Sequence, residues 1–105
     1  MIQLSEELRA GWCVVAVRGR ADAETAETLE NGLRAAVSSH PKVAADFSAL
    51  DYISSAGIRA VLQAARAAQT GAVEFAVCAL SPNVKRVFDM SGLDQILTIH
   101  GEAPC

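Results

Sequence analysis

Two adjacent serines, Ser54 and Ser55, stand directly before a strongly helical run, and their position is the one best suited to chemistry. They follow an apolar segment that ends in acidic residues, so the local order is strand, turn and helix. The first backbone amides of a helix have no partner within it, and a hydroxyl side chain can cap them. The same amides and the helix dipole also favour a phosphate group. A serine here is therefore either a structural cap or a site of modification.

No other group of residues has the spacing of a catalytic centre or a metal site. A serine nucleophile needs a neighbouring base, and the two histidines, His40 and His100, stand in a predicted turn and near the chain end. The sequence contains no Gly-x-Ser-x-Gly segment and no phosphate-binding glycine loop. Neither histidine has a metal-ligand neighbour at useful spacing, and the three cysteines match no zinc or redox pattern. We therefore predict a binding module without catalytic residues, bound metal or cofactor.

Two aspartates bracket the acidic segment that precedes the serines. Asp46 and Asp51 could form a carboxylate pair for acid–base chemistry. Residues of this type more often accept hydrogen bonds from the backbone of their own turn. Both interpretations predict a turn between residues 46 and 51.

Length, charge and hydropathy limit the classes of protein that the chain can belong to. Its 105 residues fit one domain, spanning residues 1–105. The net charge of −3 and the absence of a clustered basic face argue against nucleic-acid binding. The chain start lacks the pattern of a signal peptide, and no apolar stretch approaches the length of a membrane span. We expect a cytoplasmic protein that is a monomer when free and that binds neither nucleic acid nor membrane.

The hydrophobic pattern predicts strands alternating with helices. Helices are expected to begin near Ala23 with Asp22 as cap, after Ser55, and at Ser81-Pro82. The predicted strands cover residues 2–4, 12–17, 43–47, 73–80 and 97–99, with Gly19 as a break and a short turn at 93–96. This β-β-α-β-α-β-α order predicts an α/β fold, in which helices pack on a mixed sheet of four to five strands through right-handed crossovers.

Residues 46–58, with the sequence DFSALDYISSAGI, resemble the central motif of STAS domains, and specifically of bacterial anti-sigma factor antagonists. Residues 19–22 (GRAD) and 78–93 (CALSPNVKRVFDMSGL) resemble two further segments of this family in the same order. The resemblance spans almost the whole chain and implies a STAS-like fold.

The resemblance also implies a partner switch, whose output is the regulation of transcription, of secretion or of another kinase-controlled pathway. In this family the unmodified protein binds an anti-sigma factor that is also a serine kinase with an ATP-binding, histidine-kinase-like fold. The kinase phosphorylates a serine at the head of the central helix, and the complex dissociates. A PP2C-type phosphatase then restores the serine.

The chain departs from the family at the phosphorylated position. The usual segment is Asp-Ser-Ser-Gly, with the modified serine directly before the glycine, whereas here Ala56 precedes Gly57. The acceptor is then Ser55 or Ser54, or the domain binds without modification, as part of a transport or signalling assembly. A ligand-binding domain with a nucleotide or small anion at the helix N-terminus is a further alternative.

Several residues around the serines are predicted to contact a partner. Asp22 and Asp46 are expected on turns at the same sheet edge, where they would make the site more acidic, and the resemblance implies that Asp22 contacts the kinase. Ile58 could instead belong to the core. The full set of predicted partner-binding residues is Asp22, Asp46, Ile53, Ser54, Ser55, Gly57, Ile58 and Arg59.

Overall fold

A computed structural model describes residues 1–93 and 97–100, which form a five-stranded sheet with three helices. The strands are β1 (Ile2–Arg9), β2 (Trp12–Ala21), β3 (Lys42–Ile53), β4 (Glu74–Cys78) and β5 (Thr98–His100), and the helices are α1 (Ala26–Ser39), α2 (Ser55–Thr70) and α3 (Pro82–Met90). The spatial order follows the chain, with β1 antiparallel to β2 and all other neighbours parallel. The predicted α/β class, mixed sheet and element order are confirmed.

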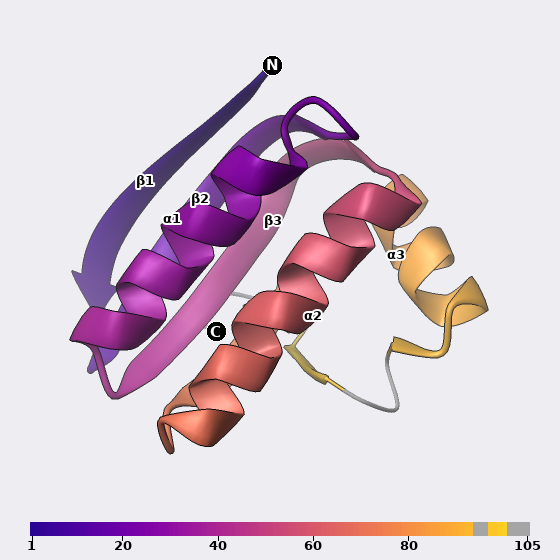
Figure 1. The fold of residues 1–105 in the computed structure, drawn as a ribbon. Coiled ribbons are helices and arrows are strands. Elements are labelled where there is room, and N and C mark those ends of the chain that lie inside the picture. Colours follow the sequence, from indigo (N-terminus) through magenta and orange to yellow (C-terminus); the bar gives the residue numbers. More distant parts are fainter. Residues whose placement is uncertain (94–96, 101–105) are drawn as a thin grey trace.

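The order of the strands across the sheet determines which face the helices cover. Because β2 to β5 follow one another across the sheet, right-handed crossovers bring the connecting helices to the same face. Figure 1 shows α1 and α2 side by side across this face, with α3 near the carboxyl end of β3. Phe88 of α3 packs edge-on against Phe47 of β3, with ring centroids 6.2 Å apart. No helix in the described part of the chain is long and apolar enough to cross a membrane.

The hairpin formed by β1 and β2 is longer than the sequence pattern predicts. Its two turn residues, Ala10 and Gly11, have φ angles of 53° and 86°, as in the tight turns whose twist matches that of paired strands. The expected break at Gly19 is wrong, since β2 continues to Ala21. Gly19 keeps its place in the strand with φ +110°, where a side chain would collide with the Met1 carbonyl oxygen.

β3 also extends beyond its predicted end at residue 47, and the predicted acidic turn is therefore wrong. The strand runs to Ile53 beside β2, with register irregularities between Ala16 and Arg18 and between Gly19 and Arg20. These irregularities let the polar segment stay in the sheet while its apolar residues reach the core. The turn predicted at 93–96 lies largely outside the described residues.

Candidate functional site

The N-terminus of α2 lies where the carboxyl ends of β2 and β3 meet. Ala21 and Ile53 are register partners at these ends, and the backbone N–H of Ser54 donates to the Ala21 carbonyl at 2.8 Å. The chain turns directly from β3 into α2 at this point. In open parallel sheets, the carboxyl edge is where binding residues generally gather.

The two serines have different environments, although they are adjacent. Ser54 is the N-cap of α2, and its hydroxyl accepts from the backbone N–H of Gly57 at 3.3 Å. Ser54 is half-buried, whereas Ser55, the first residue of the helix, is exposed. No hydrogen bond joins the Ser55 hydroxyl to any other described residue. Ser54 is thus occupied as a structural cap, and Ser55 offers a free hydroxyl to the outside.

Gly57 and Ile53 hold this helix end against the sheet. Ile53 is only 2% exposed and Gly57 is buried. A Cβ atom at Gly57 would lie 2.8 Å from Ile53 Cγ1 and 2.9 Å from both Cβ and the carbonyl oxygen of Ala21. The lack of a side chain therefore lets the first turn of α2 approach β2 and β3. Both residues position the site, and their predicted contact with a partner stays a prediction.

Asp22 stands beside this helix end and organises the turn into α1. Its carboxylate accepts from the backbone N–H of Glu24 at 3.0 Å, the backbone N–H of Thr25 at 3.2 Å and the Thr25 hydroxyl at 3.2 Å. Partial desolvation raises the pKa of Asp22, but these hydrogen bonds and the N-terminal ammonium group outweigh it and leave the pKa below its usual value. Asp22 therefore carries a negative charge near the site. The prediction that Asp22 caps the first helix is wrong, because α1 begins three residues later than predicted, at Ala26, and Thr25 is its N-cap residue.

Asp46 does not lie at the same sheet edge, contrary to the expectation from sequence. It sits inside β3, in register with Ala16 and Cys78, and its carboxylate accepts from the Ser48 backbone N–H at 2.9 Å. It shares a face with Ala44 of a small cluster separate from the helix-covered core, because the two residues are two positions apart. Seven residues of strand, about 23 Å, separate Asp46 from Ile53. Asp46 therefore adds no charge to the N-terminus of α2.

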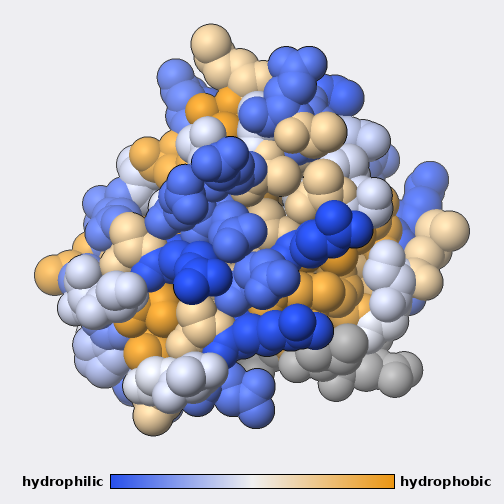
Figure 2. All heavy atoms as spheres, viewed as in Figure 1, coloured by the Kyte–Doolittle hydropathy of each residue, from blue (hydrophilic) through white to orange (hydrophobic). Residues whose placement is uncertain are grey.

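A groove on the outer side of α2 begins at Ser55. Arg59 is exposed one turn after Ser55, and Ile58 is half-buried and packs against the core, as one interpretation of the sequence predicted. Hydrophilic side chains cover much of the surface formed by α1 and α2 (Figure 2). The residues that line the groove are Ser55, Ile58, Arg59, Leu62, Gln63 and Arg66. An anion attached to Ser55 would therefore have two cationic side chains along the same groove.

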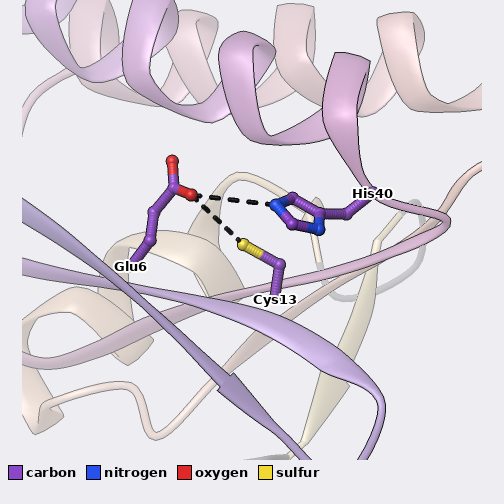
Figure 3. A group of neighbouring side chains, drawn as sticks. All are labelled: Glu6, Cys13 and His40. Carbon is purple, nitrogen blue, oxygen red and sulfur yellow. Dashed lines mark hydrogen bonds and ion pairs between the residues drawn. The ribbon is translucent and has the colours of Figure 1, made fainter.

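Sequence reasoning missed two side-chain groups. The Arg20 guanidinium lies over the Tyr52 ring, 4.4 Å from its centroid, close to the α2 N-terminus. At the other end of the sheet, the buried Cys13 thiol donates to Glu6, which also approaches His40 (Figure 3). Burial, the Glu6 charge and this hydrogen bond raise the pKa of Cys13 to about 11. Only the hairpin register, which the sequence left open, could have revealed that Glu6 and Cys13 are neighbours.

Comparison with known proteins finds similarity over nearly the whole chain. The STAS domain family matches residues 3–102. A protein of Bordetella bronchiseptica named as the anti-sigma factor antagonist BtrV is 37% identical over 90 residues, which are 85% of this chain and 78% of that protein.

Solved structures share the fold. An anti-sigma factor antagonist from Mycobacterium paratuberculosis superposes with a TM-score of 0.88 and 28% identity, covering 98% of this chain and 88% of that one. The Bacillus cell fate determinant SpoIIAA in its phosphorylated form gives a TM-score of 0.69 at 22% identity, covering 97% and 93%.

Proposed function

Because the chain belongs to the STAS domain family, we propose that it is an anti-sigma factor antagonist controlled by phosphorylation of Ser55. The family is one of binding domains rather than enzymes, so the activity resides in a docking surface. In this proposal the unmodified protein binds an anti-sigma factor that is also an ATP-dependent serine kinase. Phosphorylation separates the two proteins, and a PP2C-type phosphatase restores the serine.

The free and exposed hydroxyl of Ser55 is the observation that carries this proposal. A kinase must bring the acceptor oxygen to the γ-phosphate of ATP, and an oxygen on the surface of a helix end can enter another protein's active site. Ser54 is half-buried, and its hydroxyl accepts a hydrogen bond from the Gly57 backbone N–H. Phosphorylation of Ser54 would therefore disturb the cap of α2. These differences favour Ser55 as the acceptor, one position earlier than the family pattern places it.

The modified protein can keep its fold. The Ser55 oxygen takes the phosphoryl group from ATP, ADP leaves, and the hydroxyl proton passes to a base of the kinase. The product carries a charge of about −1.5 to −2 at neutral pH. At the first position of α2 this charge is favoured by the helix dipole, by about 0.3–1 kcal/mol. Arg59 lies one turn further along the same groove and is a suitable counter-ion.

Because the phosphorylated protein keeps its fold, the loss of binding must come from the effect of the phosphate on the contact with the kinase. A phosphate at Ser55 adds bulk and charge in the middle of the proposed docking surface, which includes Asp22, Ile58 and Arg59. A hundredfold loss of affinity corresponds to only about 2.8 kcal/mol. One charge that is buried on docking without a partner can account for such a loss.

Incubation with the cognate kinase and ATP, followed by intact mass measurement, tests the acceptor assignment. We expect a gain of one phosphate in the wild type and in Ser48→Ala, a control at an exposed serine of β3. We expect no gain in Ser55→Ala. Phosphorylation of Ser55→Ala to the wild-type extent, together with its loss in Ser54→Ala, would show that Ser54 is the acceptor.

Binding of the unmodified protein to the kinase tests the antagonist role separately. Isothermal titration should give a measurable complex for the wild type and an affinity lowered at least about tenfold for Ser55→Asp, equivalent to about 1.4 kcal/mol. Aspartate in the first turn is compatible with the helix dipole, so the variant should fold normally. A kinase complex that Ser55→Asp leaves unchanged would instead indicate an interaction domain without this switch.

A further inference from the structure

Three side chains capable of binding a metal converge at the end of the sheet opposite Ser55. Glu6 comes from β1, Cys13 from the start of β2, and His40 caps the C-terminus of α1 (Figure 3). Glu6 Oε1 lies 3.6 Å from Cys13 Sγ and 3.9 Å from His40 Nε2. One potential ligand atom from each residue lies within 4.8 Å of the other two. Because the three residues belong to different elements, the fold brings them together.

These separations are close to those around a bound transition-metal ion. Tetrahedral coordination, with a sulfur at about 2.3 Å and nitrogen or oxygen at about 2.0–2.1 Å, places the ligand atoms about 3.3–3.6 Å apart. The observed distances approach this range and need shifts of a few tenths of an ångström to about one ångström. Glu6 and His40 side chains are 49% and 28% exposed, so they have room to make these shifts.

We propose that Glu6, Cys13 and His40 form a binding site for a thiophilic divalent metal ion, with Zn²⁺ as its occupant. A thiolate, an imidazole and a carboxylate together suit Zn²⁺ or Co²⁺, whereas Mg²⁺ and Ca²⁺ select oxygen ligands. The Cys13 sulfur is the innermost ligand, since that residue is 1% exposed, and the other two stand at the surface as an entry path. On binding, the Cys13 S–H bond breaks, its proton goes to solvent and a sulfur–metal bond forms. A water molecule completes four-coordination.

The position of the site predicts what the ion does. It ties the edge strand β1 and the end of α1 to β2, which lies inside the sheet. An ion that binds only the folded chain raises the ratio of folded to unfolded molecules about a hundredfold at 100 times its dissociation constant. We therefore expect ZnCl₂ to raise the thermal unfolding temperature of the full chain.

Titration with CoCl₂, followed by competition with ZnCl₂, tests the proposal on the reduced full-length protein. Wild type should bind one Co²⁺ with the near-ultraviolet charge-transfer absorption of a thiolate–cobalt bond, and Zn²⁺ should remove it. Glu6→Gln and His40→Gln, both at partly exposed positions, should weaken Zn²⁺ binding by about tenfold or more. Cys13→Ser should abolish the charge-transfer band.

Matched variants separate this site from incidental binding elsewhere. Glu7→Gln changes the next residue of β1, which pairs with Val14 and so lies on the opposite sheet face. Glu7→Gln, His100→Gln and Cys105→Ser should all bind like the wild type. The proposal is overturned if the wild type gives no thiolate band. It is equally overturned if Glu6→Gln and His40→Gln retain wild-type affinity, even where Cys13→Ser fails to fold.

Discussion

Alanine substitutions at the two adjacent serines should have opposite consequences for stability and modification. Ser54→Ala removes an N-cap whose hydroxyl accepts from the Gly57 backbone N–H at 3.3 Å. Loss of such a cap costs about 0.5–2 kcal/mol, and the long hydrogen bond places this one near 1 kcal/mol. Ser55 is exposed and has no partner to lose, and alanine is the better helix former. Ser55→Ala should therefore change the free energy of unfolding by no more than about 0.5 kcal/mol.

Urea denaturation followed by circular dichroism measures this difference. For a domain of about this size, a loss of 1 kcal/mol also lowers the melting temperature by about 4–8 °C. Phosphorylation by the kinase should show the reverse order, persisting in Ser54→Ala and disappearing in Ser55→Ala. Equal destabilisation by the two substitutions would refute the reasoning, because it would mean that Ser55 has a structural partner.

Three further substitutions or titrations test how the site and the thiol are held. Gly57→Ala should lower the free energy of unfolding, measured in urea titrations, by about 1–2 kcal/mol, because the overpacking of the new methyl group against Ala21 and Ile53 costs more than alanine gains in a helix. An unchanged free energy of unfolding would mean that the N-terminus of α2 can move away from the sheet. Asp22→Ala should lower the melting temperature, whereas Asp22→Asn should not, because the amide oxygen can still accept the hydrogen bonds of this turn. Because the pKa of Asp22 is lowered in the folded state, the stabilising effect of its charge is complete above the unfolded pKa and is lost as pH falls through the folded pKa. Asp22→Asn should lack this pH dependence. The pKa of Cys13 is raised from 9.0 to about 11, so the contribution of its thiol to stability is complete below pH 9 and is lost as pH rises to 11. Urea titrations with a chelator present should show the wild type losing stability faster than Cys13→Ala over this interval. Parallel curves would contradict the raised pKa of Cys13.

The parts of the fold that follow from local pattern could be predicted from the sequence. The apolar stripes of α1 and α2 recur at helical spacing, and the break at Gly71 and the Ser81-Pro82 start mark helix ends correctly. Even here the physical role can differ from the expected one. The Ser81 hydroxyl does not cap α3 but donates to the Leu50 carbonyl at 2.8 Å, which fastens the start of α3 to β3.

Features that depend on neighbouring strands could not be predicted in this way. The mixture of polar and apolar residues after Phe47 is typical of a turn, and only the bulged pairing with β2 keeps it in a strand. Because the sequence predicts a turn here, it also predicts the wrong position for Asp46, which lies inside β3. The neighbourhood of Glu6 and Cys13 likewise depends on the hairpin register, and His40 joins them only because α1 ends above that hairpin.

The two ends of β2 are too far apart to influence each other through charge. Cys13 and Ala21 are eight residues apart in the strand, a distance of about 26 Å, whereas charges in 0.1 M salt are screened over about 10 Å. β2 is paired with β1 on one side and with β3 on the other along most of its length, which holds it in place between them. Energies at sites so separated add. A metal ion at Cys13 would therefore stabilise the unmodified and the phosphorylated protein equally, and would leave the choice between binding and release to Ser55.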